Sequence, residues 1–153
     1  MNLMEAKHMG YDDLAAELMD EMKSLHSIKP QQHINEAFRG EAFILDYIAT
    51  HEGTVLPSEI GHVMDVSSAR IANALGNLEK KGLITRRIDT GDRRRILIEL
   101  TAHGKEMAHK HHQAILGVVS KMLSLLGEDD AKEYVRINKR LSQILPDCDD
   151  FVQ

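Results

Sequence analysis

The sequence has no tryptophan, and it has only three tyrosines, three phenylalanines and three prolines among 153 residues. Aromatic residues favour strands, so their scarcity argues against a protein built mainly of β-sheet. Leu, Ile, Val, Met and Ala must therefore form most of the core, and a chain of this length is enough for one domain or a small domain with helical extensions. These features predict a mainly helical protein.

Cysteine and long apolar runs are also scarce. The single cysteine, Cys148, excludes an intrachain disulfide and favours a reducing, cytoplasmic setting. Its acidic neighbours Asp147, Asp149 and Asp150 disfavour a thiolate, so a thiol-based redox sensor is not expected. No apolar run is long enough to span a membrane, and the N-terminal residues lack the apolar block of a secretory signal. No nucleotide-binding loop or nucleophile elbow occurs, so we expect neither an enzyme nor a bound cofactor.

Positive charge is concentrated in one segment of an acidic chain. The net charge is −5, yet residues 70–95 alone carry +5, which leaves −10 for the remainder. The basic residues of this segment are Arg70, Lys80, Lys81, Arg86, Arg87, Arg93, Arg94 and Arg95. A local basic patch on an acidic body can bind phosphates while the body resists nonspecific association.

Apolar residues recur at helical spacing outside this segment. They predict a first helix over 11–28 that Pro30 ends, and a second over about 40–51. A long helix follows Thr101, and a final helix is closed by Pro146. The first helix and the last two have more apolar surface than a small core can cover, which favours an interface between two subunits.

The stretch 56–104 predicts a winged helix-turn-helix. Pro57 opens a short helix, because a proline in the first turn removes no hydrogen bond. Ser67 is expected to cap the following helix, 67–81, which Gly82 ends. Alternating apolar residues then predict two antiparallel strands, 84–88 and 95–100, joined by the turn residues of Asp-Thr-Gly-Asp.

One face of the helix 67–81 is polar. At about 100° per residue, Arg70, Asn73, Asn77 and Lys80 lie opposite the apolar side. Arginine can bind guanine and asparagine can bind adenine in a major groove. Ser67 and Ser68, at the helix N-terminus, can bind a phosphate. The alternative is an ordinary solvated face, but the short helix before it and the basic hairpin after it favour contact with DNA.

The tip between the two strands carries Asp92, Arg93, Arg94 and Arg95. Three adjacent arginines repel one another, and a polyanion would relieve that repulsion. A narrow hairpin tip can enter a minor groove, whose negative potential attracts arginine. Asp92 is placed to pair with Arg94 and hold its direction. The alternative is a patch that only improves solubility at a sheet edge.

These motifs resemble the MarR family of transcription regulators. The family's wing pattern, Asp-x-Arg followed by Leu-Thr, matches Asp92, Arg94, Leu100 and Thr101. Similar family patterns match 57–60, 78–84 and 100–104, and the helical order agrees over most of the chain. Gly76, like Gly61, departs from the family's usual alanine or larger residue. The resemblance implies a repressor that binds a palindromic operator as a homodimer. It also implies a small-molecule effector that binds between the DNA-binding lobe and the dimerisation helices.

A histidine cluster in the long helix leaves an alternative open. His109 and His112 are one helical turn apart, and Glu106 is placed near His109, so the three are candidate ligands of a metal. Some zinc-responsive relatives carry a His cluster in this helix, here within His103–His112, and use a further Cys or His from their first two helices. Ala42 occupies the nearest matching place in this chain, no Cys lies near its first helix, and His26 and His33 are the possible substitutes. Histidines on a solvated surface are the preferred interpretation, with no metal bound.

The prediction is a mainly α protein with an α+β winged helix-turn-helix core, a two-stranded wing, and terminal helices that form a dimerisation region. Residues 36–101 would be the DNA-binding domain, and 1–35 with 102–153 the dimerisation region. The expected function is sequence-specific binding of double-stranded DNA, with the zinc-responsive metalloregulator as one alternative. Two further alternatives are a winged-helix protein-interaction module that does not bind DNA and a small metal-dependent enzyme.

Overall fold

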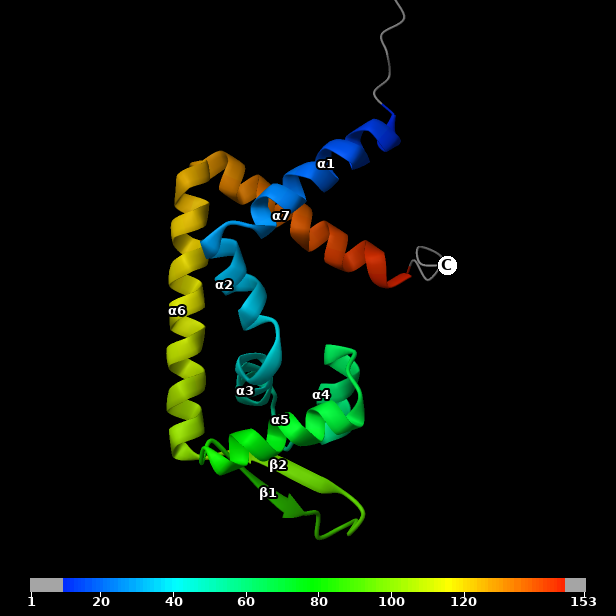
Figure 1. Cartoon of the computed structure of the whole chain (residues 1–153), viewed down its shortest axis with the longest axis vertical. Coiled ribbons are helices and arrows are strands. Elements are labelled where there is room, and N and C mark those ends of the chain that lie inside the picture. The colour runs from blue at the N-terminus through cyan, green and yellow to red at the C-terminus, as the bar shows by residue number, and fades with distance from the viewer. Residues whose placement is uncertain (1–9, 148–153) are drawn as a thin grey trace, which may run out of the picture.

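The structure is a computed structural model in which residues 10–147 are described, so that Cys148 and the prediction made for it lie outside the described residues. Within this range the chain forms seven α-helices and one two-stranded antiparallel sheet (Figure 1), which confirms the predicted mainly helical fold with a two-stranded wing. The elements are α1 (Tyr11–His26), α2 (Lys29–Ala37), α3 (Gly40–Thr50), α4 (Pro57–Met64), α5 (Ser68–Lys80), β1 (Ile84–Ile88), β2 (Ile96–Leu100), α6 (Ala102–Leu126), α7 (Glu128–Ile144) and the short 3-10 helix η1 (Leu145–Asp147).

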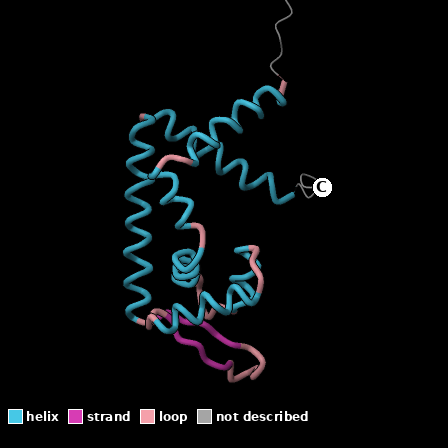
Figure 2. The backbone as a smooth tube through the Cα atoms, viewed as in Figure 1, coloured by secondary structure: helices cyan, strands magenta, loops and turns pink. Residues whose placement is uncertain are grey.

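The long helix α6 is the spine of the molecule. The sheet and α5 lie at its N-terminal end, while α7 turns back from its C-terminal end (Figure 2). Helices α2 and α3 pack along α6 between these two ends. The winged core and the terminal helices therefore occupy opposite ends of one continuous helix.

The prediction that Pro30 ends the first helix is wrong, since that helix already ends at His26. Pro30 instead lies in the first turn of α2, a helix that the apolar spacing did not predict. Backbone N–H groups in a first turn have no partner within the helix, so proline is tolerated there. Helix α2 buries Ile34 and brings the chain from α1 back to the core.

The ends of α4 and α5 follow from local hydrogen bonds. Pro57 begins α4, and the Glu59 carboxylate accepts a hydrogen bond of 2.6 Å from the backbone N–H of Leu56. Ser67 caps α5 as predicted, because its hydroxyl accepts a hydrogen bond from the backbone N–H of Arg70 at 3.3 Å. Gly82 follows α5 with a φ of 70°, a left-handed conformation that glycine adopts without steric cost.

The two strands pair as a hairpin, with Ile84 opposite Leu100 and Ile88 opposite Ile96. The base of the hairpin is anchored in the core, and an isolated bridge from Val55 to Ile98 adds a third short segment on the far side of β2. Towards the tip, Ile88 is 63% exposed and Ile96 44% exposed. The outer half of the hairpin thus extends beyond the core as a wing.

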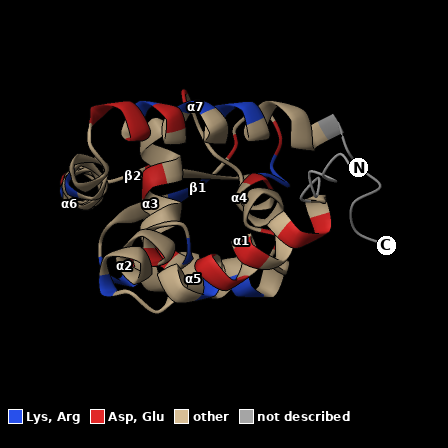
Figure 3. Ribbon diagram, turned by 90° about the horizontal axis from the view of Figure 1, so that it is seen from above, with Lys and Arg blue, Asp and Glu red and all other residues tan. Residues whose placement is uncertain are grey.

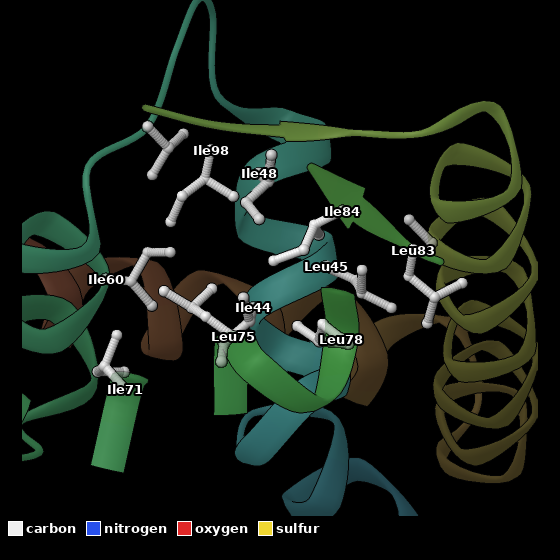
Figure 4. Close-up of a cluster of buried hydrophobic side chains, with 12 residues drawn as sticks. Ile44, Leu45, Ile48, Ile60, Ile71, Leu75, Leu78, Leu83, Ile84 and Ile98 are labelled. Atoms are coloured by element: carbon white, nitrogen blue, oxygen red, sulfur yellow. The ribbon is translucent and has the colours of Figure 1, made fainter. Parts of the chain in front are cut away.

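The hydrophobic core joins α3, α4, α5 and the hairpin (Figure 4). Its fully buried side chains come from each of these elements and from the segment before α4: Ile44, Val55, Ile60, Leu75, Leu78, Ile84 and Ile98. All are aliphatic, as the scarcity of aromatic residues predicted. Burial of an aliphatic side chain of this size contributes about 1.5–3 kcal/mol, so this cluster fixes α5 and the base of the wing relative to each other.

Helices α1 and α7 bury no side chain, although both are amphipathic. In Figure 3 they lie apart, with acidic residues marked along α1 and at the start of α7. Exposed apolar side chains on the two helices include Leu14, Leu18, Met22, Tyr134 and Leu141. Among the described helices, none is both long and apolar enough to cross a membrane.

Candidate nucleic-acid interface

The polar face of α5 points to solvent, as its sequence predicted. Arg70, Asn73, Asn77 and Lys80 are all exposed, whereas Ile71, Leu75 and Leu78 on the opposite face are buried. None of these four side chains makes a hydrogen bond or ion pair to another described residue. Their donors and acceptors are therefore available to an external partner.

The N-terminus of α5 is also exposed, with Ser67 and Ser68 at the surface. The Ser67 hydroxyl accepts the capping hydrogen bond, but its own O–H remains free to donate. Backbone N–H groups of the first helical turn lie beside it, and the helix dipole makes this end weakly positive. The arrangement suits a phosphate oxygen.

The wing tip is ordered by hydrogen bonds from its own aspartates. The Asp92 carboxylate accepts hydrogen bonds from the backbone N–H of Arg94 at 3.0 Å and from the Arg94 Nε at 3.3 Å. The Asp89 carboxylate accepts one from the backbone N–H of Gly91 at 2.8 Å. The Arg94 side chain is nevertheless 93% exposed. The predicted pairing of Asp92 with Arg94 is therefore present, and it directs the guanidinium outwards.

Most of the basic residues in 70–95 have an acidic partner, so this segment has less unpaired positive charge than the sequence suggested. Five ion pairs are formed: Lys81 with Glu41, Arg86 with Glu79, Arg87 with Glu99, Arg94 with Asp92, and Arg95 with Asp89. Within the described residues, Arg70, Lys80 and Arg93 have no such partner. The unpaired cations thus lie on the outer face of α5 and at the wing tip, the two places predicted to contact DNA.

One of these ion pairs connects α5 to the wing. The Arg86 guanidinium, on β1, donates hydrogen bonds from Nε at 2.9 Å and from Nη2 at 2.5 Å to one carboxylate oxygen of Glu79, in the last turn of α5. A β-carbon on Gly76, one turn earlier, would lie 4.0 Å from that Nη2. No local pattern in the sequence predicts the pairing of Glu79 with Arg86, because a separation of seven residues across a turn has no recognisable periodicity.

The direction of the pKa shift of Glu79 agrees with its contact with Arg86. The hydrogen bond from Arg86 lowers the pKa of the Glu79 carboxyl below its ordinary value of 4.5, and the positive charge of Arg86 adds to the effect. Glu79 is therefore a carboxylate at neutral pH, and its contact with Arg86 is an ion pair.

Two of the three candidate metal ligands pair with other residues instead. Glu106 pairs with Lys110 at 2.8 Å, and the hydrogen bond from Lys110 lowers the pKa of the Glu106 carboxyl. His112 Nδ1 lies 3.1 Å from a carboxylate oxygen of Asp46 on α3. Over residues 10–147, no three His, Cys, Asp or Glu side chains are grouped so that they could hold a metal ion. The structure does not bring Glu106, His109 and His112 together as one ligand set.

A cavity of about 480 Å³ lies between α2, α3 and α6. Its wall is largely apolar and includes Phe38, Ile115 and Val119, while His33 and Glu36 contribute polar groups. Its position between the winged core and the terminal helices is the one expected for an effector site.

A helix-turn-helix with an exposed polar face on its second helix, followed by a basic hairpin, defines a winged helix-turn-helix regulator of transcription. Comparison with known proteins agrees: the model of the MarR family matches residues 39–95. Over 143 residues, the chain is 28% identical to the uncharacterised HTH-type transcriptional regulator YwhA of Bacillus subtilis (strain 168), covering 88% of this chain and 100% of that protein.

Two similar solved structures contain DNA. The Streptococcus pneumoniae protein FabT, in complex with DNA, superposes with a TM-score of 0.67 at 23% identity and covers 90% of this chain and 99% of its own. The Staphylococcus aureus MepR–DNA complex superposes with a TM-score of 0.58 at 26% identity and covers 88% and 98%. The likeness to the MarR family thus rests on a family-model match over residues 39–95 and on similar proteins that cover most of this chain.

Proposed function

We propose that this protein is a sequence-specific DNA-binding repressor that acts as a homodimer on a roughly palindromic operator. The observation that carries the proposal is the pair of exposed surfaces on α5 and the wing, whose cations Arg70, Lys80 and Arg93 have no partner among the described residues. The DNA complexes of FabT and MepR support it, because both proteins share the fold and MepR also shares 26% of the sequence.

In this proposal α5 enters a major groove. Arg70, Asn73, Asn77 and Lys80 face base edges and phosphates, and Ser67 and Ser68 hold a phosphate at the helix N-terminus. The wing, 89–95, reaches the adjacent minor groove. Arg93, Arg94 and Arg95 lie in its negative potential, while Asp92 orients Arg94. The two elements therefore contact DNA in different ways, by base recognition and by charge.

Dimerisation would use the terminal helices, 1–35 and 102–153, and 36–101 would be the DNA-binding domain. Support comes from α1 and α7, which expose Leu14, Leu18 and Leu141 and bury no side chain within one chain. Isolated apolar residues on a surface are ordinary, but two amphipathic helices without a buried face are not. A two-fold dimer would place the two α5 helices on one side of the DNA and explain a palindromic site.

We also propose that a small apolar molecule regulates DNA binding from the cavity between α2, α3 and α6. Such a ligand must prefer one arrangement of the winged core relative to the terminal helices, since equal affinity for two arrangements shifts neither. The cavity is bordered by elements of both regions, so a ligand there can sense their relative position. Since the proposed partner is DNA, we infer that the protein acts in the cytoplasm.

The test is selection of bound sequences from a random pool of double-stranded DNA by the full chain. We expect enrichment of one motif with two-fold symmetry. Enrichment of an asymmetric motif would reject the homodimer arrangement. No enrichment, with the protein folded, would reject DNA recognition and favour a winged-helix protein-interaction module. A rise in melting temperature with zinc that is lost in His109→Ala or His112→Ala would favour a metalloregulator.

A further inference from the structure

The wing is attached to α5 at few points. The covalent connection runs through Gly82, whose φ of 70° marks a sharp change of chain direction. The base of the hairpin is held by Ile84 and Ile98, which are 1% and 0% exposed. Further out, Ile88 and Ile96 are 63% and 44% exposed, so apolar packing restrains the outer half of the wing less than its base. A further contact there would restrain the angle of the wing to α5.

Arg86 is placed to make that contact. It lies two residues beyond the buried Ile84 on β1, and its two hydrogen bonds to Glu79 reach back to the last turn of α5. Arg87, the next residue, instead donates to Glu99 at 2.9 and 3.1 Å. Glu99 belongs to β2, so this second pair joins the two strands of the wing to each other and leaves their angle to α5 unchanged.

Gly76 leaves room for the connection. Glu79 and Gly76 are three residues apart and so lie on the same side of α5. A β-carbon at residue 76 would be in van der Waals contact with the Arg86 guanidinium, at 4.0 Å from Nη2. A longer side chain there would occupy the space through which Arg86 approaches the helix.

We propose that Glu79 is a positioning residue for DNA recognition. Through Arg86 it fixes the angle of the wing to α5, and with it the spacing between the major-groove and minor-groove contacts of one half-site. This inference rests on the proposed function. Its physical basis is that two charge-assisted hydrogen bonds, from Nε and Nη2 to one carboxylate oxygen, restrain the orientation of the guanidinium more strongly than one would.

The first experiment needs no DNA. Spin labels are attached at Ala69→Cys on α5 and Thr90→Cys at the wing tip, in a Cys148→Ser background, and the distance distribution is measured by pulsed electron resonance. Glu79→Gln should broaden the distribution. Glu99→Gln removes the same charge but only breaks the pair within the wing, so it is the matched control and should leave the distribution narrow. Equal distributions in all three proteins would overturn the inference.

The second experiment measures spacing preference. Wild type and variants are titrated against the selected operator and against two operators with one base pair inserted or deleted between the major-groove and minor-groove contacts. Glu79→Gln should reduce the preference for the native spacing by up to about fivefold, the upper end of the range for a surface ion pair. Glu99→Gln should keep the preference. The double variant Glu79→Arg/Arg86→Glu, which restores the pair with reversed charges, should recover it.

The outcomes separate this inference from the proposed function. If wild type binds the operator and Glu79→Gln keeps the spacing preference, Glu79 does not position the wing. If Glu79→Gln strengthens binding to every duplex equally, Arg86 contacts phosphate directly and Glu79 merely restrains it, which also rejects the inference. If wild type itself recognises no operator, the proposed function fails, and the distance measurement still reports whether Glu79 holds the wing.

Discussion

The carbonyl oxygen of Leu83 lies against the α-carbon of Gly104, so that a β-carbon at residue 104 would be 1.8 Å from that oxygen. Leu83 begins the hairpin and Gly104 lies in the first turn of α6. The same carbonyl accepts a hydrogen bond of 3.1 Å from the backbone N–H of Thr101. The two ends of the hairpin therefore meet at the start of α6, at a distance that only glycine permits.

Replacement of Gly104 by alanine should destabilise the protein by roughly 2 kcal/mol or more, because backbone atoms must move to admit the new carbon. Chemical denaturation would measure the change in the free energy of unfolding. Gly117→Ala is the control within the same helix, where a β-carbon meets no atom within 4 Å. That control should stabilise by up to about 1 kcal/mol, the difference in helix propensity. Equal effects of the two substitutions would contradict the close approach.

The Thr101 hydroxyl makes two hydrogen bonds at the same junction. It accepts from the backbone N–H of Gly104 at 2.9 Å and donates to the carbonyl oxygen of Gly82 at 2.7 Å. Thr101→Val keeps the shape and removes both bonds, so we expect a loss of about 1–2 kcal/mol, as for a helix cap. Thr101→Ser keeps the hydroxyl and should lose less. A valine variant as stable as wild type would show that these hydrogen bonds have no net effect.

The ion pair between Glu79 and Arg86 should be visible in acid titration. The pKa of Glu79 is lowered by its hydrogen bond from Arg86, so the pair contributes stability above the ordinary carboxyl pKa of 4.5. That contribution is lost as the pH falls through the lowered pKa, where the folded protein takes up the proton. Nuclear magnetic resonance of the Glu79 carboxyl should give a pKa below 4.5, and Arg86→Gln should return it towards that value. An unchanged pKa in Arg86→Gln would show that the two side chains do not pair in solution.

Substitutions on α5 and on the wing should have different effects on DNA binding. Arg94→Ala should weaken binding to every sequence and reduce the salt dependence of the binding constant by about one unit per lost contact. Asn73→Ala or Arg70→Ala should also change the preferred bases, since each base contact contributes roughly 1–3 kcal/mol of discrimination. Each variant would be titrated against the operator and a scrambled duplex at two salt concentrations. Binding like that of wild type in all three variants would exclude this surface as the DNA site.

The exposed apolar residues of α1 and α7 predict a dimer in solution. Light scattering at micromolar concentration should give twice the mass of the chain. Leu141→Glu places a charge on the apolar side of α7 and should give a monomer that keeps its helical circular dichroism. Gln143→Glu adds the same charge on the polar side and should remain dimeric. A monomeric wild type would remove the basis for a palindromic operator.

The sequence predicted the winged region more accurately than the region before it. Ser67, Gly82 and Thr101 mark element boundaries by local chemistry, and such boundaries need no tertiary contact to be recognised. Pro30 carried an ambiguous signal, because proline both ends one helix and begins the next. Helix α2 was missed for that reason, and also because its single buried residue, Ile34, gives no periodic pattern.

The sequence predicted which side chains of the candidate interface point outwards. It did not predict which of them pair with residues of another helix or strand. The exposed face with Arg70 and Asn73 follows from helical periodicity alone. The pairing of Arg86 with Glu79 depends on how the hairpin packs on α5, which no local pattern encodes. The pairing of His112 with Asp46 joins residues 66 positions apart. Tertiary contacts of this kind determine which arginines are paired within the fold and which remain available to a ligand.

Helix α6 contains 25 residues and no proline, which corresponds to a rod of roughly 37 Å. At one end its first turn is joined to the wing through Thr101, and at the other it continues into α7 through Gly127. A rod of this length works as a lever, since a tilt of about 5° at one end displaces the other by roughly 3 Å. A small tilt of the terminal helices would thus cause a larger displacement of the wing, even if no side-chain contact between the two ends changed.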